Sequence, residues 1–137
     1  MRGDAMPDVR IDSRGVPKAP VYEVTPPVLH RGPLTAPDTT DPTGPEAGVD
    51  CAGYRVVRFD IDTSGSAALT ALEVQLLVWN PTAGRYFGGA RRRFEAQDLQ
   101  ANPSPSLEAE VRGATVFLKV VDAQANALSL RIYASLS

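Results

Sequence analysis

The chain contains 137 residues, of which 43% are hydrophobic and 22% are charged, and its formal net charge is −2. This length suits one domain. The sequence contains no run of about 18 apolar residues, so no membrane-spanning helix is predicted. The near-neutral charge excludes a protein whose main partner is nucleic acid or an anionic membrane, because both attractions need a basic excess. Cys51 is the single cysteine, which excludes an intrachain disulfide and a cysteine-rich zinc site. We therefore expect a soluble, cytoplasmic protein with no cofactor, no metal and no membrane partner.

Residues 1–50 differ in composition from the rest of the chain. They hold nine of the twelve prolines and one of the nine aromatic residues, and their five basic residues are outnumbered by eight acidic ones. Proline fixes φ, lacks an amide donor and restricts the residue before it, so this spacing disfavours helices and long strands. We predict an extended, proline-rich N-terminal arm at residues 1–50 and a folded domain at residues 51–137.

Two short patches of the arm have the alternating pattern of a strand. Val9 and Ile11 lie on one side of residues 8–12, and a second patch covers residues 21–24. Each is long enough to add a strand to a neighbouring sheet, where backbone hydrogen bonds give affinity and alternate side chains give specificity. The residues predicted to bind neighbouring subunits are Val9, Ile11, Val21, Tyr22 and Val24. The alternative is an arm that wraps its own domain.

The domain begins with two stretches of apolar and polar alternation, at residues 54–62 and 71–79. A period of two is typical of a strand with one buried face. Residues 80–84 read as a turn, and a return strand starts at Arg85. The pair Gly88-Gly89 within that strand predicts a bulge or a bend.

The rest of the domain continues the strand pattern. One helical turn is expected near residues 95–100, followed by strands at 107–111, 114–122 and 128–136. Six or more antiparallel strands predict an all-β fold, a β-sandwich of jelly-roll-like or immunoglobulin-like type. A single rolled barrel is the alternative.

The residues needed for catalysis are scarce. His30 is the only histidine and lies in the arm, without the rigid scaffold that catalytic geometry needs. We expect Cys51 to be a small buried residue rather than a nucleophile. Asp60 and Asp62 share one strand face, which we interpret as a solvated face rather than a calcium site. The chain is therefore predicted not to be an enzyme.

Two groups of domain residues are candidates for surface contacts. Arg91, Arg92 and Arg93 would alternate between strand faces, so that at most two form a patch. An ion pair with an acidic neighbour, such as another copy's arm, explains them better than nucleic-acid contact. Trp79 and Tyr86 could form an aromatic platform like those of carbohydrate-binding sandwiches. Covering by the arm is the better explanation of these rings.

An extended proline-rich arm followed by a small β-sandwich resembles, in architecture only, the minor structural proteins of tailed-phage virions. These include decoration (cement) proteins and head or tail accessory proteins. The resemblance implies a structural protein whose β domain docks on a protein lattice and whose arm laces onto neighbouring subunits. The implied partners are further copies of the chain or a major capsid or tail protein, and the implied location is the virion, after assembly in the host cytoplasm. The alternative function is a carbohydrate-binding module.

Overall fold

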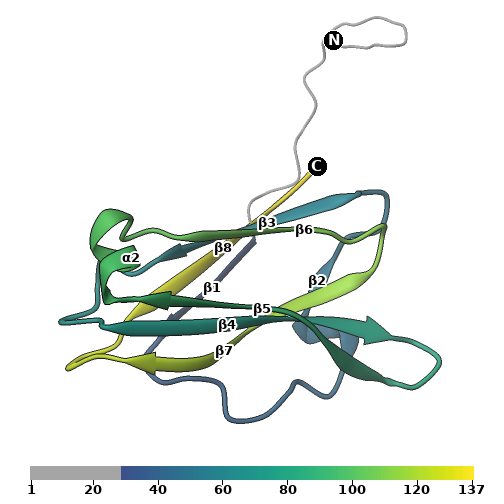
Figure 1. Ribbon diagram of the computed structural model, residues 1–137. Helices are drawn as coiled ribbons and strands as arrows, with labels where there is room; N and C mark the ends of the chain where they lie inside the picture. Colours follow the sequence, from purple (N-terminus) through teal and green to yellow (C-terminus); the bar gives the residue numbers. More distant parts are fainter. Residues whose placement is uncertain (1–28) are drawn as a thin grey trace, which may run out of the picture.

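The computed structural model describes residues 29–137. Two antiparallel sheets of four strands form a β-sandwich, with strand orders β1-β8-β3-β6 and β2-β7-β4-β5 (Figure 1). The predicted arm contacts at Val9, Ile11, Val21, Tyr22 and Val24 lie outside the described residues. The strands are β1 (Leu29–Leu34), β2 (Val49–Asp50), β3 (Val56–Asp62), β4 (Ala71–Asn80), β5 (Arg85–Glu95), β6 (Ser106–Glu110), β7 (Thr115–Gln124) and β8 (Leu130–Leu136). A 3-10 turn, η1 (Pro45–Ala47), and a short helix, α2 (Ala96–Ala101), complete the fold.

The inner faces of the two sheets form the core. Alternating side chains of β3 and β8 are buried, among them Phe59, Ile61 and Leu130. From the other sheet, Leu72 and Val74 of β4 pack against them. The predicted β-sandwich is confirmed. Within residues 29–137 no strand of one sheet pairs with a strand of the other, so the barrel alternative is wrong.

The β4–β5 hairpin has the predicted turn and bulge. The Asn80 side-chain oxygen accepts hydrogen bonds from the backbone N–H groups of Thr82 and Ala83, and Gly84 closes the turn with φ of +67°. Gln75 pairs with Arg91 but Leu77 pairs with Gly88, so that Leu76 faces two residues of β5. This extra residue is the β-bulge that Gly88-Gly89 predicts.

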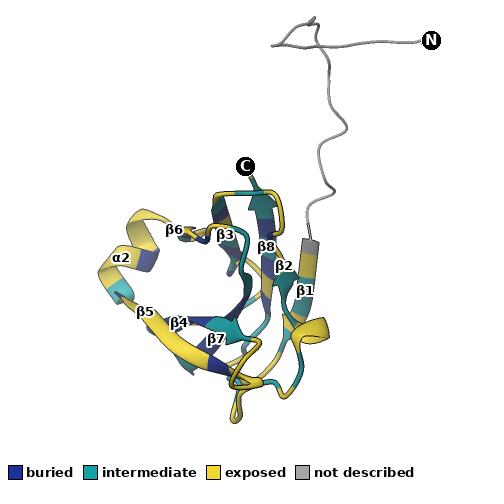
Figure 2. Cartoon of the chain, turned by 90° about the vertical axis from the view of Figure 1, so that its right-hand side faces the viewer, coloured by how far each residue is buried: buried dark blue, intermediate teal, exposed yellow. Residues whose placement is uncertain are grey.

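Residues 29–50 are part of the sandwich, so the structure differs from the predicted boundary at residue 50. β1 pairs along β8, with His30 opposite Tyr133, and β2 pairs with the start of β7. Both are rim strands of their sheets (Figure 2). A rim strand needs backbone donors on one side only, so it tolerates Pro33, where the β1 register shifts. The proline spacing therefore limits the length of these strands without preventing them.

An ion pair joins the two sheets on the side of β1. The Arg31 guanidinium donates to both carboxylate oxygens of Asp38, at 3.2 and 3.1 Å, and to the backbone oxygen of Leu118 in β7, at 2.7 Å. Asp38 in turn pairs with Val120: its N–H donates to the Val120 oxygen, and its carboxylate accepts from the Val120 N–H. The loop of residues 35–48 thereby covers the edge of β7 that the two-residue strand β2 leaves open.

We expect Asp38→Ala to lower the free energy of unfolding by about 2 kcal/mol, because it leaves the half-buried Arg31 without a counter-ion and the Val120 N–H without an acceptor. Urea unfolding monitored by circular dichroism measures the change. Asp41→Ala is the matched control, since it breaks the single-contact Lys119–Asp41 pair on the same loop, in which the Asp41 side chain is 49% exposed, and should cost about 0.5 kcal/mol or less. Equal effects of the two variants would contradict the role given to Asp38.

Candidate functional site

The outward-facing side chains of β4 and its neighbours form one surface, which we call the outer face of the β2-β7-β4-β5 sheet. Cross-strand pairing divides it into two zones. Trp79 pairs with Tyr86 at one end, whereas Glu73 pairs with Arg93 at the other. The outer face therefore carries aromatic rings beside the hairpin turn and charged groups beside α2.

The aromatic zone is covered by the 35–48 loop. Tyr86 is 3% exposed and packs with Leu77 and Phe117, while its hydroxyl donates to the Gly44 backbone oxygen at 3.1 Å. Burial raises the pKa of this hydroxyl. A Cβ at Gly48 would lie 2.6 Å from the Tyr86 oxygen, so this close approach of loop and ring requires glycine.

Tyr86 therefore cannot act as the exposed aromatic platform that the carbohydrate-binding hypothesis needs. Its burial agrees with the favoured hypothesis, in which a segment of the predicted arm (residues 1–50) covers the rings. Trp79 packs edge-on against Tyr86, with ring centroids 5.1 Å apart, and remains half-buried. A single half-buried indole is left at this end of the outer face.

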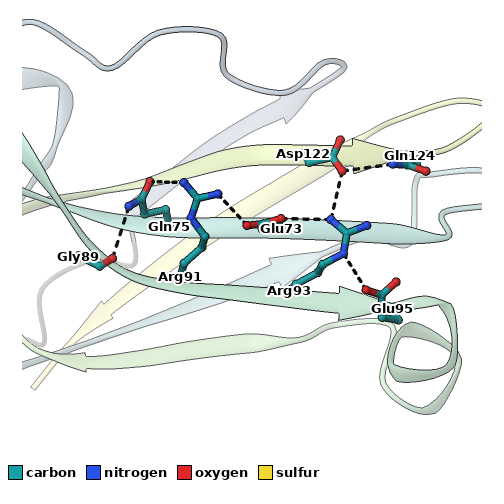
Figure 3. Close-up of polar contacts among 8 residues, drawn as sticks. All are labelled: Glu73, Gln75, Gly89, Arg91, Arg93, Glu95, Asp122 and Gln124. Atoms are coloured by element: carbon teal, nitrogen blue, oxygen red, sulfur yellow. Dashed lines mark hydrogen bonds and ion pairs between the residues drawn. The ribbon is translucent and has the colours of Figure 1, made fainter.

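The charged zone is an ion-pair network centred on Glu73 and Arg93 (Figure 3). Glu73 accepts from Arg91 at 2.8 Å and from Arg93 at 3.1 Å. Arg93 also binds Glu95 at 2.7 Å and Asp122 at 3.3 Å. The hydrogen bond from Arg91 is the main cause that holds the pKa of Glu73 below its usual range, and the bond to Glu95 is the main cause that raises the pKa of Arg93.

The three consecutive arginines alternate between the two faces of β5. Arg91 and Arg93 lie on the outer face, whereas Arg92 pairs with the inward-facing Val74 and its guanidinium lies 5.1 Å from the Phe94 ring centre. Arg91 and Arg93 pair with acidic residues of their own sheet, whereas the sequence analysis expected an acidic neighbour such as another copy's arm. Because these cations are largely neutralised by neighbours, they do not form a free basic patch.

The rim formed by β5 is the most open part of the sheets. β5 has eleven residues, pairs with β4 on one side, and has two buried residues, Tyr86 and Phe94 (Figure 2). Within residues 29–137 no strand pairs with its other side. Phe87, on the face of β5 that points toward the second sheet, is 41% exposed, and the Arg85 guanidinium lies 4.1 Å from its ring centre.

The potential catalytic groups are not brought together. Cys51 is fully buried after β2, its thiol donates to the Val49 backbone oxygen, and burial raises its pKa to about 11. His30 lies in β1 of the other sheet and stacks on Tyr133. A thiol with a raised pKa is a poor nucleophile.

Within residues 29–137 no cluster of three or more His, Cys, Asp or Glu residues could hold a metal ion. In the same residues no helix is long and apolar enough to cross a membrane.

A cavity of about 270 Å³ opens between the sheets at the β1 and β2 rims. Core residues, among them Phe59, Leu118 and Ile132, line its floor. Its titratable lining groups are His30 and Arg31, and Arg31 is already bound to Asp38. The cavity therefore has an apolar floor and no pair of groups suited to proton transfer.

No protein-family model matches the chain, and no curated protein sequence matches it. Among solved structures, the chain is similar to an X-ray crystal structure of a non-crystalline cellulose specific carbohydrate-binding module. The TM-score is 0.35 at 14% sequence identity, over 65% of this chain and 59% of that chain. The match thus spans less than two thirds of that module. A likeness at this level carries no functional argument, so function rests on the geometry of the site itself.

We expect Glu73→Gln to lower stability at neutral pH and to leave it unchanged in acid. The pKa of Glu73 is lowered in the folded state, so its stabilising effect is present above the usual carboxyl pKa and is lost as pH falls through the folded-state value. Urea unfolding of both proteins between neutral pH and pH about 3 measures this difference. Glu108→Gln, at a residue without an ion pair within residues 29–137, is the control and should show little change at any pH. A constant deficit for Glu73→Gln across this range would contradict the ionic explanation.

Proposed function

We propose that this chain is a non-enzymatic structural protein that assembles with other protein subunits through the β5 rim and the N-terminal residues 1–28. The observation that carries the proposal is the long open edge of β5. Its eleven residues include four arginines and a half-exposed phenylalanine, Phe87. An exposed strand edge pairs readily with an added strand, which makes it a common protein-binding surface.

The other sheet rims are poorly suited to pairing. β1 contains Pro33 and a register shift, β2 has two residues, and β6 has five. The edge of β7 beyond β2 is covered by Asp38. Natural sheets shield their edges in these ways to avoid uncontrolled association. The contrast with β5 supports binding at that rim.

The chemistry of the described residues supports the same class of function. The single buried thiol is protonated, and the charged groups of the outer face are used in pairs with one another. Groups engaged in this way stabilise a sheet surface but are not poised to act on a substrate. A role in binding and assembly fits this arrangement better than catalysis does.

Within this proposal, the specific role is that of a tailed-phage virion component, either a capsid decoration protein or a head–tail accessory protein. Its support is the layout of a compact sandwich preceded by the proline-rich residues 1–28. Such a chain would dock on a capsid or tail lattice while its N-terminal segment contacts a neighbouring subunit. Joining weak contacts in one chain raises the apparent affinity without any new chemical group.

Deletion of residues 1–28 tests the assembly role. We expect the shortened chain to fold, because β1 and the Arg31–Asp38 pair remain, but to sediment as free protein in gradients of lysate from the producing cells. The full chain should sediment with multi-subunit particles. Deletion of residues 1–50 is a matched comparison that should fail to fold, since it removes β1, β2 and Asp38. The proposal fails if the full chain sediments as free protein or if the shortened chain still sediments with particles.

A carbohydrate-binding module is the alternative function, and the half-buried Trp79 beside Tyr86 is the feature that would serve it. Sugar rings stack on exposed aromatic faces, and here Tyr86 is covered, so one indole remains. We therefore expect no binding on a glycan array. Binding that is lost in Trp79→Ala but kept in Phe87→Ala would replace the assembly proposal with this alternative.

A further inference from the structure

We propose that residues 21–25 of a second copy of the chain add as a strand to the open edge of β5. This inference rests on the assembly role proposed above and names the partner of that rim. It has three parts: an acceptor edge, a donor segment of matching length and charge, and a chain geometry that prevents the donor from reaching the acceptor of its own copy.

The acceptor is the regular part of β5 after the bulge. From Arg91 to Glu95 every residue pairs in register with β4, so these five residues form a regular strand without a bulge. Arg91 and Arg93 present cations on the outer face, whereas Arg92 and Phe94 lie on the other face. An added strand would therefore meet ion-paired arginines on one side and, on the other, a ring covered by the Arg92 guanidinium.

The donor is the sequence VYEVT at residues 21–25, which lies between Pro20 and Pro26. Valine, tyrosine and threonine are strong strand formers, and the prolines limit the strand to about five residues. When Glu23 faces Arg91 or Arg93, alternation places Tyr22 and Val24 on the opposite face, beside Arg92. Opposite charges and aromatic or β-branched residues on neighbouring strands stabilise their pairing.

Charge favours this pairing over stacking of two β5 strands. β5 carries four arginines and one glutamate, and within residues 29–137 no acidic residue pairs with Arg85 or Arg92. Two β5 strands side by side would therefore bring these like charges close together. The donor segment carries one acidic residue and no basic one. Complementary charge raises the rate of encounter and suppresses like-charged partners.

The distance along the chain shows why the donor must come from another copy. β1 begins at Leu29 on one rim of the sandwich, and β5 is the last strand on the opposite rim (Figure 2). Three strand spacings separate these rims by about 14 Å within a sheet, and the second sheet adds about 10 Å. The four residues from position 25 to Leu29 reach about 14 Å at most, even along a straight line. They cannot pass around the sandwich to their own β5.

Donor and acceptor thus lie on opposite rims, and each copy offers both. Contacts of this kind are head-to-tail, and they build open chains or closed rings rather than isolated two-fold dimers. The same geometry suits a subunit that links its neighbours along a lattice.

Sedimentation velocity of the purified full chain at rising concentration tests the inference. We expect the mean mass to rise above that of the monomer, and the double variant Tyr22→Gly/Val24→Gly to weaken association by about tenfold or more, through loss of two cross-strand pairs. The matched control is Val16→Gly/Ala19→Gly, which makes two glycine changes in the same N-terminal segment outside both predicted strand patches and should leave association unchanged.

A mixing experiment identifies the acceptor. Arg92→Glu places a negative charge on β5 and should also weaken self-association. An equal mixture of Arg92→Glu with Tyr22→Gly/Val24→Gly should form a heterodimer, since the first variant keeps the donor and the second keeps the acceptor. A full chain that stays monomeric, a donor variant that associates like the full chain, or a mixture without heterodimer would each overturn the inference. If the full chain is monomeric when pure yet sediments with particles in lysate, the strand exchange is wrong and the assembly role stands.

Discussion

The Arg31–Asp38 pair is the interaction on which the arrangement of the sandwich depends. It connects β1 of one sheet to β7 of the other, and it holds the 35–48 loop along the β7 edge. The two side chains are 30% and 19% exposed, and their hydrogen bonds also satisfy backbone groups of Leu118 and Val120. A partly buried pair whose polar atoms are satisfied is costly to break on one side, unlike an exposed surface pair.

Because the 35–48 loop covers the edge of β7, β5 is the long strand of this sheet whose edge remains unpaired within residues 29–137. The loop that Asp38 anchors also brings Gly44 onto the Tyr86 hydroxyl, so the aromatic end of the outer face is covered by the same segment. Within residues 29–137 the loop hydrogen-bonds to β5 at Tyr86, beside the hairpin turn, and it makes no hydrogen bond to the stretch from Arg91 to Glu95. The Arg31–Asp38 pair, by holding this loop, therefore explains why Tyr86 is unavailable for ligands. It also explains why the open edge, β5, lies on the rim opposite β1.

Period-two alternation was sufficient to predict the strands that build the core, and the glycine pair was sufficient to predict the bulge. β1 and β2 were missed because they are short and the first contains Pro33, so their strand character comes from partners about 65 to 100 residues away in the sequence. The burial of Tyr86 likewise depends on Gly44, which local pattern does not reveal. The arginine run was expected to pair with an acidic neighbour such as another copy's arm, whereas its partners in the sheet, Glu73 and Asp122, follow from strand register.

The four arginines of β5 lie along the open edge, and each contacts a neighbouring side chain. Arg91 and Arg93 are held on the outer face by Glu73, Glu95 and Asp122, and Arg85 and Arg92 lie over the rings of Phe87 and Phe94. Their charge opposes pairing with another basic or purely apolar edge, which is how native sheets guard against aggregation. An incoming strand gains most when it carries an acidic residue flanked by apolar ones. In the proposed assembly, charge would select the partner strand and backbone hydrogen bonds would supply the affinity.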